Sequence, residues 1–279
     1  MDFNKTAEIV YGNIEKVKPV IHNISNIVAV NDCANVTLAC GGSPIMSDYP
    51  QEVEDITSLC NGFVINMGHI YDYLVESMIL AGKRSNLLGH PVILDPVGAG
   101  AAKARNAAIF KVLDNVKFSV IRGNISEIKF LATGSGSAKG VDADEKDLVT
   151  DENIESVIAL AKKLSKKTGA VIAISGETDI IADDKQAYII KNGHAEMAKI
   201  TGTGCMLSSV LGVFCAANPE NILGASAVAV SAYGYAGELA YKKILQTDGG
   251  TGSFRMYLMD YVSKMNAKLL EEGAKVESR

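Results

Sequence analysis

Short runs of β-branched and other apolar residues alternate with longer amphipathic stretches along most of the chain. The short runs are typical of buried strands, and the longer stretches carry the three- and four-residue apolar spacing of helices. We predict strands over 19–23, 62–66, 92–95, 118–122 and 170–174, and a hairpin across 179–191. We predict helices over 5–16, 29–40, 51–60, 70–80, 103–113, 126–131, 152–166, 205–216, 222–245 and 252–270. This alternation predicts an α/β fold with a central, mostly parallel sheet and helices on both of its faces.

The composition narrows the classes of protein that fit this pattern. The 279 residues are 48% hydrophobic and include no Trp, which excludes a disordered chain and suits aliphatic strands covered by helices. No linker-like segment or internal repeat interrupts the pattern, so we expect one domain over residues 1–279. The 27 basic and 32 acidic residues give a net charge of −5, which argues against nucleic acid as a partner.

The sequence also predicts where the protein works. Its five Cys form no CxxC pair, and no run approaches the roughly 18 apolar residues of a membrane span. The first residues lack the apolar core of an export signal, so we expect a cytoplasmic protein without a membrane partner. The Gly- and Ser-rich segment 133–140 is predicted to be a surface loop.

Polar residues follow four of the predicted strands at the point where each strand ends. Each is succeeded by a glycine within three positions, and the four are Asn66, Asp95, Arg122 and Ser175. Any one of them suits an ordinary turn. In open α/β sheets, however, ligands bind where the carboxyl ends of the strands meet. Four such ends together favour a ligand site at this edge of the sheet.

The segment 200–206, ITGTGCM, introduces a long apolar helix. Its glycines, Gly202 and Gly204, let backbone N–H groups turn inward, and the start of the helix adds a partial positive charge. Such an arrangement suits a phosphoryl group in transfer. Cys205 is expected in the first helical turn, where the pKa of a thiol is commonly lowered. The alternative is an ordinary helix cap followed by a buried Cys, and this segment alone favours neither.

Arg122, Glu127 and Asp95 are the second group of candidate residues. Mg²⁺ prefers a few carboxylates together with water and phosphate oxygens. We therefore expect Arg122 to bind phosphate oxygens and Glu127 to reach Mg²⁺ through water, with Asp95 as a second carboxylate nearby. The alternative for Glu127 is that it only stabilises the start of its own helix. The chain has no GxxxxGKS/T phosphate loop, no GxSxG and no HExxH.

These segments resemble a known group of kinases. The motifs DPVGAG (95–100), RGNISEI (122–128) and GTGC (202–205) are similar to the ribokinase-like superfamily, in which a GxGD segment ordinarily supplies an Asp base. Cys at position 205 in place of that Asp resembles the hydroxyethylthiazole kinases. The segments HNISN, GSPIM, NMG and GSFR are similar to the same family, so the resemblance covers nearly the whole chain in order. Asn23 departs from it, because many relatives carry Cys or Gln there, and this leaves the contacts at the pocket edge open.

The resemblance implies an activity and a set of roles. The activity is ATP-dependent phosphorylation of the hydroxyethyl group of 4-methyl-5-(2-hydroxyethyl)thiazole, a salvage step in thiamine biosynthesis. Met46 and Gly202 would contact the thiazole, with Asn26 and Gly68 near it. Arg122, Ser175 and Gly204 would hold ATP, Asp95 and Glu127 would organise Mg²⁺, and Cys205 would stand beside the substrate hydroxyl. The resemblance further implies a homotrimer with the thiazole site between subunits.

Three other functions stay open at this point. The first is another ribokinase-like kinase, acting on hydroxymethylpyrimidine or a sugar, and the second is an ATP-dependent nicotinamide-nucleotide hydrate dehydratase on the same fold. Both would be expected to keep the Asp that Cys205 replaces. The third is a nucleotide-binding module that has lost its base, which turnover with the thiazole alcohol would exclude.

Overall fold

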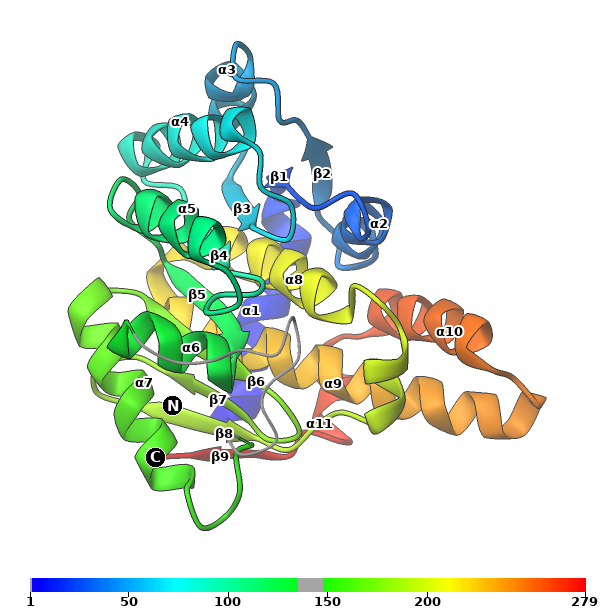
Figure 1. Cartoon of the computed structure of the whole chain (residues 1–279). Helices are drawn as coiled ribbons and strands as arrows, with labels where there is room; N and C mark the ends of the chain where they lie inside the picture. Colours follow the sequence, from blue (N-terminus) through cyan, green and yellow to red (C-terminus); the bar gives the residue numbers. More distant parts are fainter. Residues whose placement is uncertain (1, 135–147) are drawn as a thin grey trace.

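The apolar runs pair side by side in the computed structural model, which describes residues 2–134 and 148–279 (Figure 1). The strands are β1 (Val20–Ile24), β2 (Ser43–Met46), β3 (Gly62–Asn66), β4 (Val92–Asp95), β5 (Val120–Asn124), β6 (Val171–Ser175), β7 (Asp179–Ala182), β8 (Ala187–Ile190) and β9 (Val276–Ser278). Within the described residues they form one sheet in the order β2-β1-β3-β4-β5-β6-β7-β8-β9. Neighbours from β2 to β6 are parallel, and the pairs from β6 to β9 are antiparallel.

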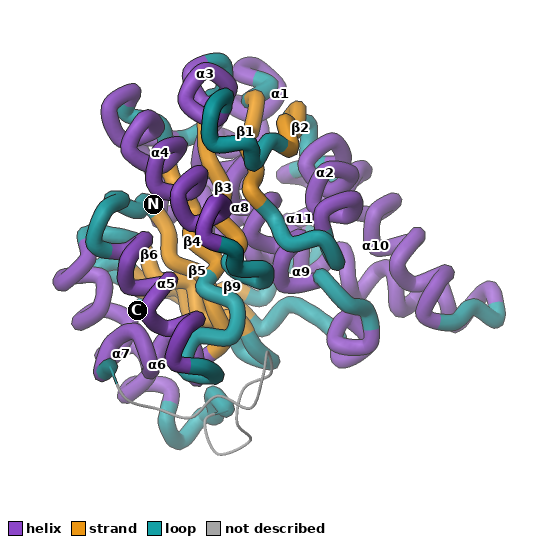
Figure 2. The backbone as a smooth tube through the Cα atoms, turned by 45° about the horizontal axis from the view of Figure 1, so that its top comes forward, coloured by secondary structure: helices purple, strands orange, loops and turns teal. Residues whose placement is uncertain are grey.

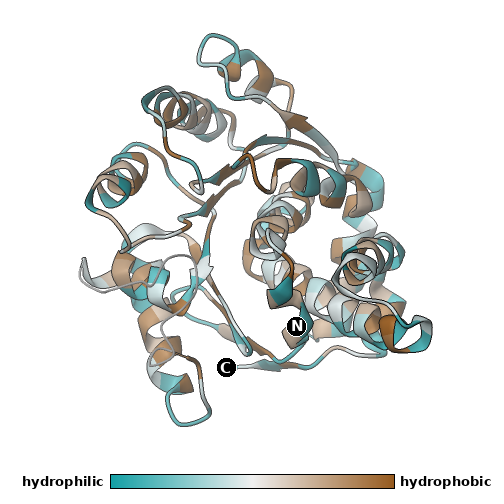
Figure 3. Ribbon diagram, turned by 45° about the vertical axis from the view of Figure 1, so that its right-hand side comes forward, coloured by the Kyte–Doolittle hydropathy of each residue, from teal (hydrophilic) through white to brown (hydrophobic). Residues whose placement is uncertain are grey.

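Helices cover both faces of this sheet, as the sequence pattern predicts. The helices are α1 (Phe3–Val17), α2 (Val30–Ala39), α3 (Val53–Ser58), α4 (Asp72–Leu88), α5 (Lys103–Leu113), α6 (Ile125–Thr133), α7 (Ile154–Thr168), α8 (Thr203–Ala217), α9 (Ile222–Thr247), α10 (Thr251–Lys264) and α11 (Ala267–Glu271), with short 3₁₀ helices η2 (Ala195–Lys199) and η3 (Pro219–Asn221). α1, α2, α8, α9 and α10 share one core with the sheet, and α3 to α7 share the other. Figure 2 and Figure 3 show the strands as a layer between the two groups of helices.

Alternation of side chains along each strand supplies both cores. On β3, Val64 joins the core with α8, whereas Phe63 and Ile65 join the core with α4. Successive strand residues point to opposite faces, so a continuous apolar run is what a strand covered on both sides requires. α8 is buried almost throughout. Within the described residues no single helix is long and apolar enough to span a membrane, and by length and composition only α8 with residues 219–247, bent by 109°, passes as a pair.

The structure differs from the sequence-based prediction at several boundaries. β2 and β9, the two edge strands, were not predicted, because each is short and lacks a distinct apolar run. The helix predicted over 252–270 is two helices, since Asn266 takes an extended backbone and caps α11 by accepting from Leu269 N–H at 3.0 Å. The helix predicted over 70–80 is α4, which ends at Gly89 in the left-handed conformation. The hairpin across 179–191 is confirmed by β7 and β8. Of the predicted loop 133–140, residues 135–140 lie outside the described residues.

The chain order of the strands sets the position of a ligand site. From β1 the chain crosses through α2 to β2 at the edge, and then returns past β1 to β3. Strand order therefore reverses direction at β1 and β3, and in sheets of this kind ligands bind beyond the carboxyl ends at that point. Polar residues end or follow β1, β3, β4, β5 and β6 there.

Close packing of α8 on the sheet gives a stability prediction. A Cβ built at Gly212 of α8 would lie 2.6 Å from Val64 Cγ2 of β3, so the helix sits where only glycine fits. We expect Gly212→Ala to lower the free energy of unfolding by about 1–3 kcal/mol through overpacking. Gly12→Ala on α1, where nothing lies within 4 Å of a built Cβ, is the matched control and should raise it by about 0.5–1 kcal/mol. Thermal melting compares the two, and equal shifts would contradict this packing.

Candidate active site

The start of α8 stands at the carboxyl edge of the sheet. Gly202 precedes the helix with a φ of 84°, in the left-handed region that glycine adopts without strain. The first backbone bond of α8 joins Met206 N–H to Gly202 O at 2.8 Å. The N–H groups of Thr203, Gly204 and Cys205 are therefore the orphan donors of the helix start, as the anion-site prediction requires.

Arg122 reaches the same helix start from β5. A Cβ built at Gly204 would lie 2.7 Å from one guanidinium nitrogen of Arg122 and 2.8 Å from the other, so glycine permits this approach. The guanidinium donates to Ser175 Oγ at 2.6 Å and forms an ion pair with Asp95 Oδ2 at 3.4 Å. Its Nε is buried and has no partner among the described residues. Arg122 thus joins the two residues predicted for ATP, Ser175 and Gly204, in one place.

Asp95 is the most connected carboxylate of the site. It is 1% exposed, and Oδ2 accepts hydrogen bonds from Asn66 Nδ2 at 3.0 Å and Ser208 Oγ at 2.7 Å besides the contact with Arg122. Burial raises the pKa of Asp95, while the Arg122 charge and the hydrogen bonds from Ser208, Arg122 and Asn66 lower it. Three elements, β3, β5 and α8, are thereby tied to the end of β4.

Asn26 links Cys205 and the loop after β3 to the same network. Its Nδ2 donates to Asn66 Oδ1 at 2.9 Å and to Cys205 Sγ at 3.3 Å. Asn66 Oδ1 also accepts from Gly68 N–H at 2.9 Å. A Cβ at Gly68 would lie 2.8 Å from the Asn26 side chain, so the loop after β3 comes this close only because position 68 is glycine.

Cys205 does not carry the lowered pKa expected from its place in the first helical turn. Burial raises the pKa of its thiol to about 12, and the nearby Asp95 adds to that rise. A side-chain hydrogen bond and the Arg122 charge lower this pKa, but they do not offset the desolvation of a thiolate. At neutral pH Cys205 is therefore a neutral thiol, which accepts a hydrogen bond from Asn26.

Glu127 serves the start of its own helix and also faces the site. One carboxylate oxygen accepts from Asn124 N–H at 2.8 Å in a capping box, and the other accepts from Gly98 N–H at 2.7 Å in the loop after β4. Burial, followed by the charge of Asp95, raises the pKa of Glu127 to about 7. The alternative is therefore confirmed in that Glu127 stabilises the start of α6. Its role in binding Mg²⁺ stays a prediction.

Asp95 and Glu127 are the carboxylates predicted to organise Mg²⁺. Among the described residues no cluster of three or more His, Cys, Asp or Glu side chains could cage an ion. Asp95 and Glu127 nevertheless interact electrostatically, and each Glu127 oxygen, which accepts from one backbone N–H, retains a further lone pair. Two hard carboxylates without a cage fit a Mg²⁺ that keeps most of its ligands from water and phosphate.

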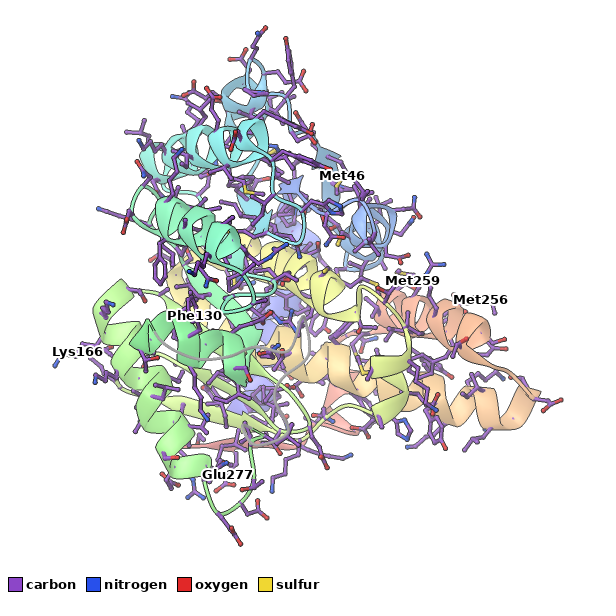
Figure 4. The ribbon with its side chains drawn as sticks, viewed as in Figure 1. Met46, Phe130, Lys166, Met256, Met259 and Glu277 are labelled. Carbon is purple, nitrogen blue, oxygen red and sulfur yellow. The ribbon has the colours of Figure 1, made fainter. Side chains whose placement is uncertain are left out.

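Met46 lies at the edge of the sheet. It ends the edge strand β2, where its register partner is Asn23, and it is half-buried. Figure 4 shows Met46 beside α2, on the same side of the molecule as Met256 and Met259 of α10. The predicted site residues on the other strand ends and on α8 are brought together within this chain, whereas Met46 lies at the sheet edge.

Three residues of the network were assigned no individual role from the sequence, although Asn66 was placed at the ligand edge. Asn66 stands in the NMG motif but was given no role, although it holds both Asp95 and Gly68. Ser208 lies inside an apolar helix, where a lone Ser gives little signal. Arg105 of α5 donates to backbone carbonyls of the loops after β3 and β4, and a surface-like helix position gave no sign of it.

Known proteins share this fold and the order of its motifs. A family model described as the hydroxyethylthiazole kinase family matches residues 12–268. A hydroxyethylthiazole kinase from Clostridium acetobutylicum is 53% identical over 266 residues, which cover 95% of this chain and 97% of that protein. One from Desulfovibrio desulfuricans is 46% identical over 270 residues, covering 94% and 95%.

Solved structures extend the likeness to the fold. A hydroxyethylthiazole kinase protein from Pyrococcus horikoshii OT3 has a TM-score of 0.87 at 30% identity and covers 99% of both chains. A pyridoxal kinase from Staphylococcus aureus in complex with pyridoxal has a TM-score of 0.53 at 15% identity, covering 76% of this chain and 86% of that one, and shows the fold alone. The fold is ribokinase-like, and both the matched residues and the full-length relatives show that the chain belongs to the hydroxyethylthiazole kinase family.

Proposed function

We propose that this chain transfers the γ-phosphoryl group of ATP to the hydroxyethyl group of 4-methyl-5-(2-hydroxyethyl)thiazole, the salvage step that feeds thiamine biosynthesis in the cytoplasm. The observation that carries the proposal is the meeting of the α8 start, Arg122 and Cys205 at one strand edge. Kinases of small alcohols need an anion site beside a hydroxyl site, and this edge supplies both.

The anion site is formed by Arg122 and the first turn of α8. Phosphoryl transfer depends mainly on positioning and on charge stabilisation, because the protein performs little covalent chemistry. Arg122 is held by Asp95 and Ser175, so its guanidinium is oriented before a phosphate arrives. Together with the Thr203, Gly204 and Cys205 amides it would hold the transferring group.

The hydroxyl site is formed around Cys205 and Asn26. A neutral thiol is a poor base, so we assign Cys205 to orienting the substrate hydroxyl rather than to taking its proton. In a loose transition state the alcohol proton leaves late, and strong base catalysis is not required. Gly202, Gly68 and Asn26 would border the thiazole, with Met46 supplied across a subunit boundary.

Glu127 and Asp95 would hold Mg²⁺ on the phosphate side. When bound, Mg²⁺ neutralises negative charge on the phosphate oxygens. Glu127 would reach the ion through water while its carboxylate stays fixed by the Gly98 and Asn124 amides. Asp95 would act more indirectly, since its oxygen already orients Arg122.

The direct test is ATP consumption by the purified protein across small alcohols, with the mass of each product determined. We expect phosphate ester from the thiazole alcohol at a rate far above that from hydroxymethylpyrimidine or sugars. Turnover only with one of those other alcohols would replace the proposed substrate. ATP binding without turnover on any alcohol would favour a non-catalytic module.

Replacement of Cys205 tests the hydroxyl site. Cys205→Asp places beside Arg122 a group that ionises far more readily than the thiol, so kcat should be retained or raised. Cys205→Ala should lower kcat by roughly tenfold to a hundredfold, because a misplaced reacting group can cost about that much in rate. Cys40→Ala is the matched control, because burial also raises the pKa of that thiol to about 12. Steady-state kinetics should show no change for the control. An Asp variant as slow as the Ala variant, at equal melting temperature, would remove Cys205 from the hydroxyl.

Replacement of Glu127 tests the metal site. Glu127→Gln removes the negative charge. The NH₂ group of the Gln side chain must then face one of the two backbone N–H groups from which the carboxylate now accepts hydrogen bonds. We expect the Mg²⁺ concentration for half-maximal rate to rise about tenfold, with little change in KM for the thiazole alcohol. Glu238→Gln is the control, since Glu238 also accepts a backbone N–H, from Gly193 at 3.2 Å. An unchanged Mg²⁺ dependence would exclude Glu127 from the metal.

Subunit mixing tests the shared site. Exposed apolar residues surround α2 and α10, namely Ile27 (73% exposed), Val28 (61%), Leu38 (57%) and Met256 (53%), which supports assembly through this side. We expect sedimentation as a trimer of the 29.5 kDa chain. The two parent proteins are Met46→Asp and Cys205→Ala, each of low activity. When they are reassembled in equal amounts as cyclic trimers, about a quarter of the sites should contain both native residues. Activity no higher than the average of the parents would contradict a site between subunits.

A further inference from the structure

Arg105 of α5 donates hydrogen bonds to backbone carbonyls of two different loops. One guanidinium nitrogen donates to Met67 O and to Val97 O, the latter at 2.9 Å, and the other donates to Gly68 O at 3.3 Å. Met67 and Gly68 follow β3, whereas Val97 follows β4. Among the described residues Arg105 forms no ion pair, so its hydrogen bonds go to the two loops that border the site.

Each of these loops passes the interaction on to a residue of the proposed machinery. The peptide unit between Val97 and Gly98 accepts from Arg105 at its carbonyl and donates at 2.7 Å to Glu127 through its N–H. Polarisation of a carbonyl by a cation strengthens the N–H of the same peptide unit as a donor. Arg105 is therefore connected to Glu127 through one peptide unit.

The second connection runs to the acceptor side. The loop residue Gly68 offers its carbonyl to Arg105 and donates its N–H to Asn66 Oδ1 at 2.9 Å. Asn66 Oδ1 also accepts from Asn26, whose amide donates to Cys205 Sγ. Arg105 lies at the far end of a continuous chain of contacts that reaches the thiol.

The local sequence accommodates this guanidinium specifically. Gly98 has a φ of 75°, and a Cβ built there would lie 3.1 Å from Arg105 Cδ. Glycine at this position thus permits both the left-handed turn that aims its N–H at Glu127 and the passage of the Arg105 side chain. A Lys offers one point charge and cannot span three carbonyls as a planar guanidinium does.

We infer that Arg105 is a positioning residue that holds the acceptor loop, 66–68, and the metal-side carboxylate Glu127 in one fixed relation. This role rests on the proposed function, since it assigns the two ends of that relation to the alcohol and to Mg²⁺. Its hydrogen bonds go to backbone carbonyls of the chain, so it acts through other residues. Its effect is to couple the two half-sites, so loss of Arg105 affects both at once.

The experiment compares Arg105→Gln and Arg105→Lys with Arg84→Gln, in the full-length protein. Arg84 is the matched control, because it is an Arg on the neighbouring helix α4 whose Nε donates to Ser58 Oγ at 2.8 Å, at the surface. Hydrogen–deuterium exchange, read by mass spectrometry without ligand, should be faster in Arg105→Gln at both 66–70 and 97–101 and unchanged in α8. Steady-state kinetics should show KM for the thiazole alcohol and the Mg²⁺ requirement each raised by about 10–100-fold, as for outer residues that orient a site. Arg105→Lys should be intermediate, and Arg84→Gln should match the wild type in both measurements.

Two results would overturn the inference. One is faster exchange at only one of the two loops, which would show that Arg105 does not couple them. The other is a lower melting temperature with both kinetic constants unchanged, which is the pattern of a merely structural residue. If Arg105→Gln fails to fold, the same readings are taken from Arg105→Lys. Exchange is independent of turnover, so if the wild type phosphorylates no thiazole alcohol, it still decides whether Arg105 couples the loops, and only the proposed function fails.

Discussion

The buried pair of Asp95 and Arg122 is the interaction on which the rest of the site depends. Asp95 is 1% exposed, and Arg122 together with donors from Asn66 and Ser208 offsets part of the cost of burying its charge. Loss of one partner from a buried pair commonly costs about 3–5 kcal/mol, because the other charge is left uncompensated. Without the carboxylate, Arg122 would lose an ion-pair partner that orients it, Asn66 of β3 would lose its side-chain bond to Asp95, and Ser208 of α8 would lose its hydrogen bond to the same group. The same carboxylate therefore orients Arg122, the proposed phosphate ligand, and helps to place α8.

The same charges explain why a thiol suits position 205. Two buried carboxylates, Asp95 and Glu127, already surround one guanidinium, and burial raises the pKa of both. A third carboxylate at 205 would be a better proton acceptor, but it would add negative charge where a triphosphate must bind. The thiol of Cys205 is neutral, with a pKa raised to about 12, so it does not compete with the phosphates for the positive charge of Arg122. Position 205 thus reflects a balance between proton affinity and phosphate binding.

The sequence predicts the sheet and the site edge well because both follow from local patterns. Apolar runs bounded by polar residues located the central strands, and Gly202 and Gly204 located the start of α8, where we propose the anion site. Long-range pairing was the part that failed. β9, at the end of the chain, pairs with β8, which lies far earlier in the sequence. Ser208 donates to Asp95, which lies 113 residues before it. The pKa of Cys205 was also out of reach, since desolvation depends on neighbours from several strands rather than on its place in the helix.

The turn at 26–29 would link the proposed assembly to the proposed chemistry. Asn26 Oδ1 accepts from Val28 N–H at 3.0 Å and Ala29 N–H at 3.1 Å, so the turn fixes the same side chain that donates to Cys205. The two residues within this turn, Ile27 and Val28, are the most exposed apolar side chains near the site, at 73% and 61%. A neighbouring subunit that buries them would immobilise the backbone that orients Asn26, since backbone hydrogen bonds hold the amide in place. In a site shared between subunits, association would then order the acceptor side directly, in addition to supplying Met46.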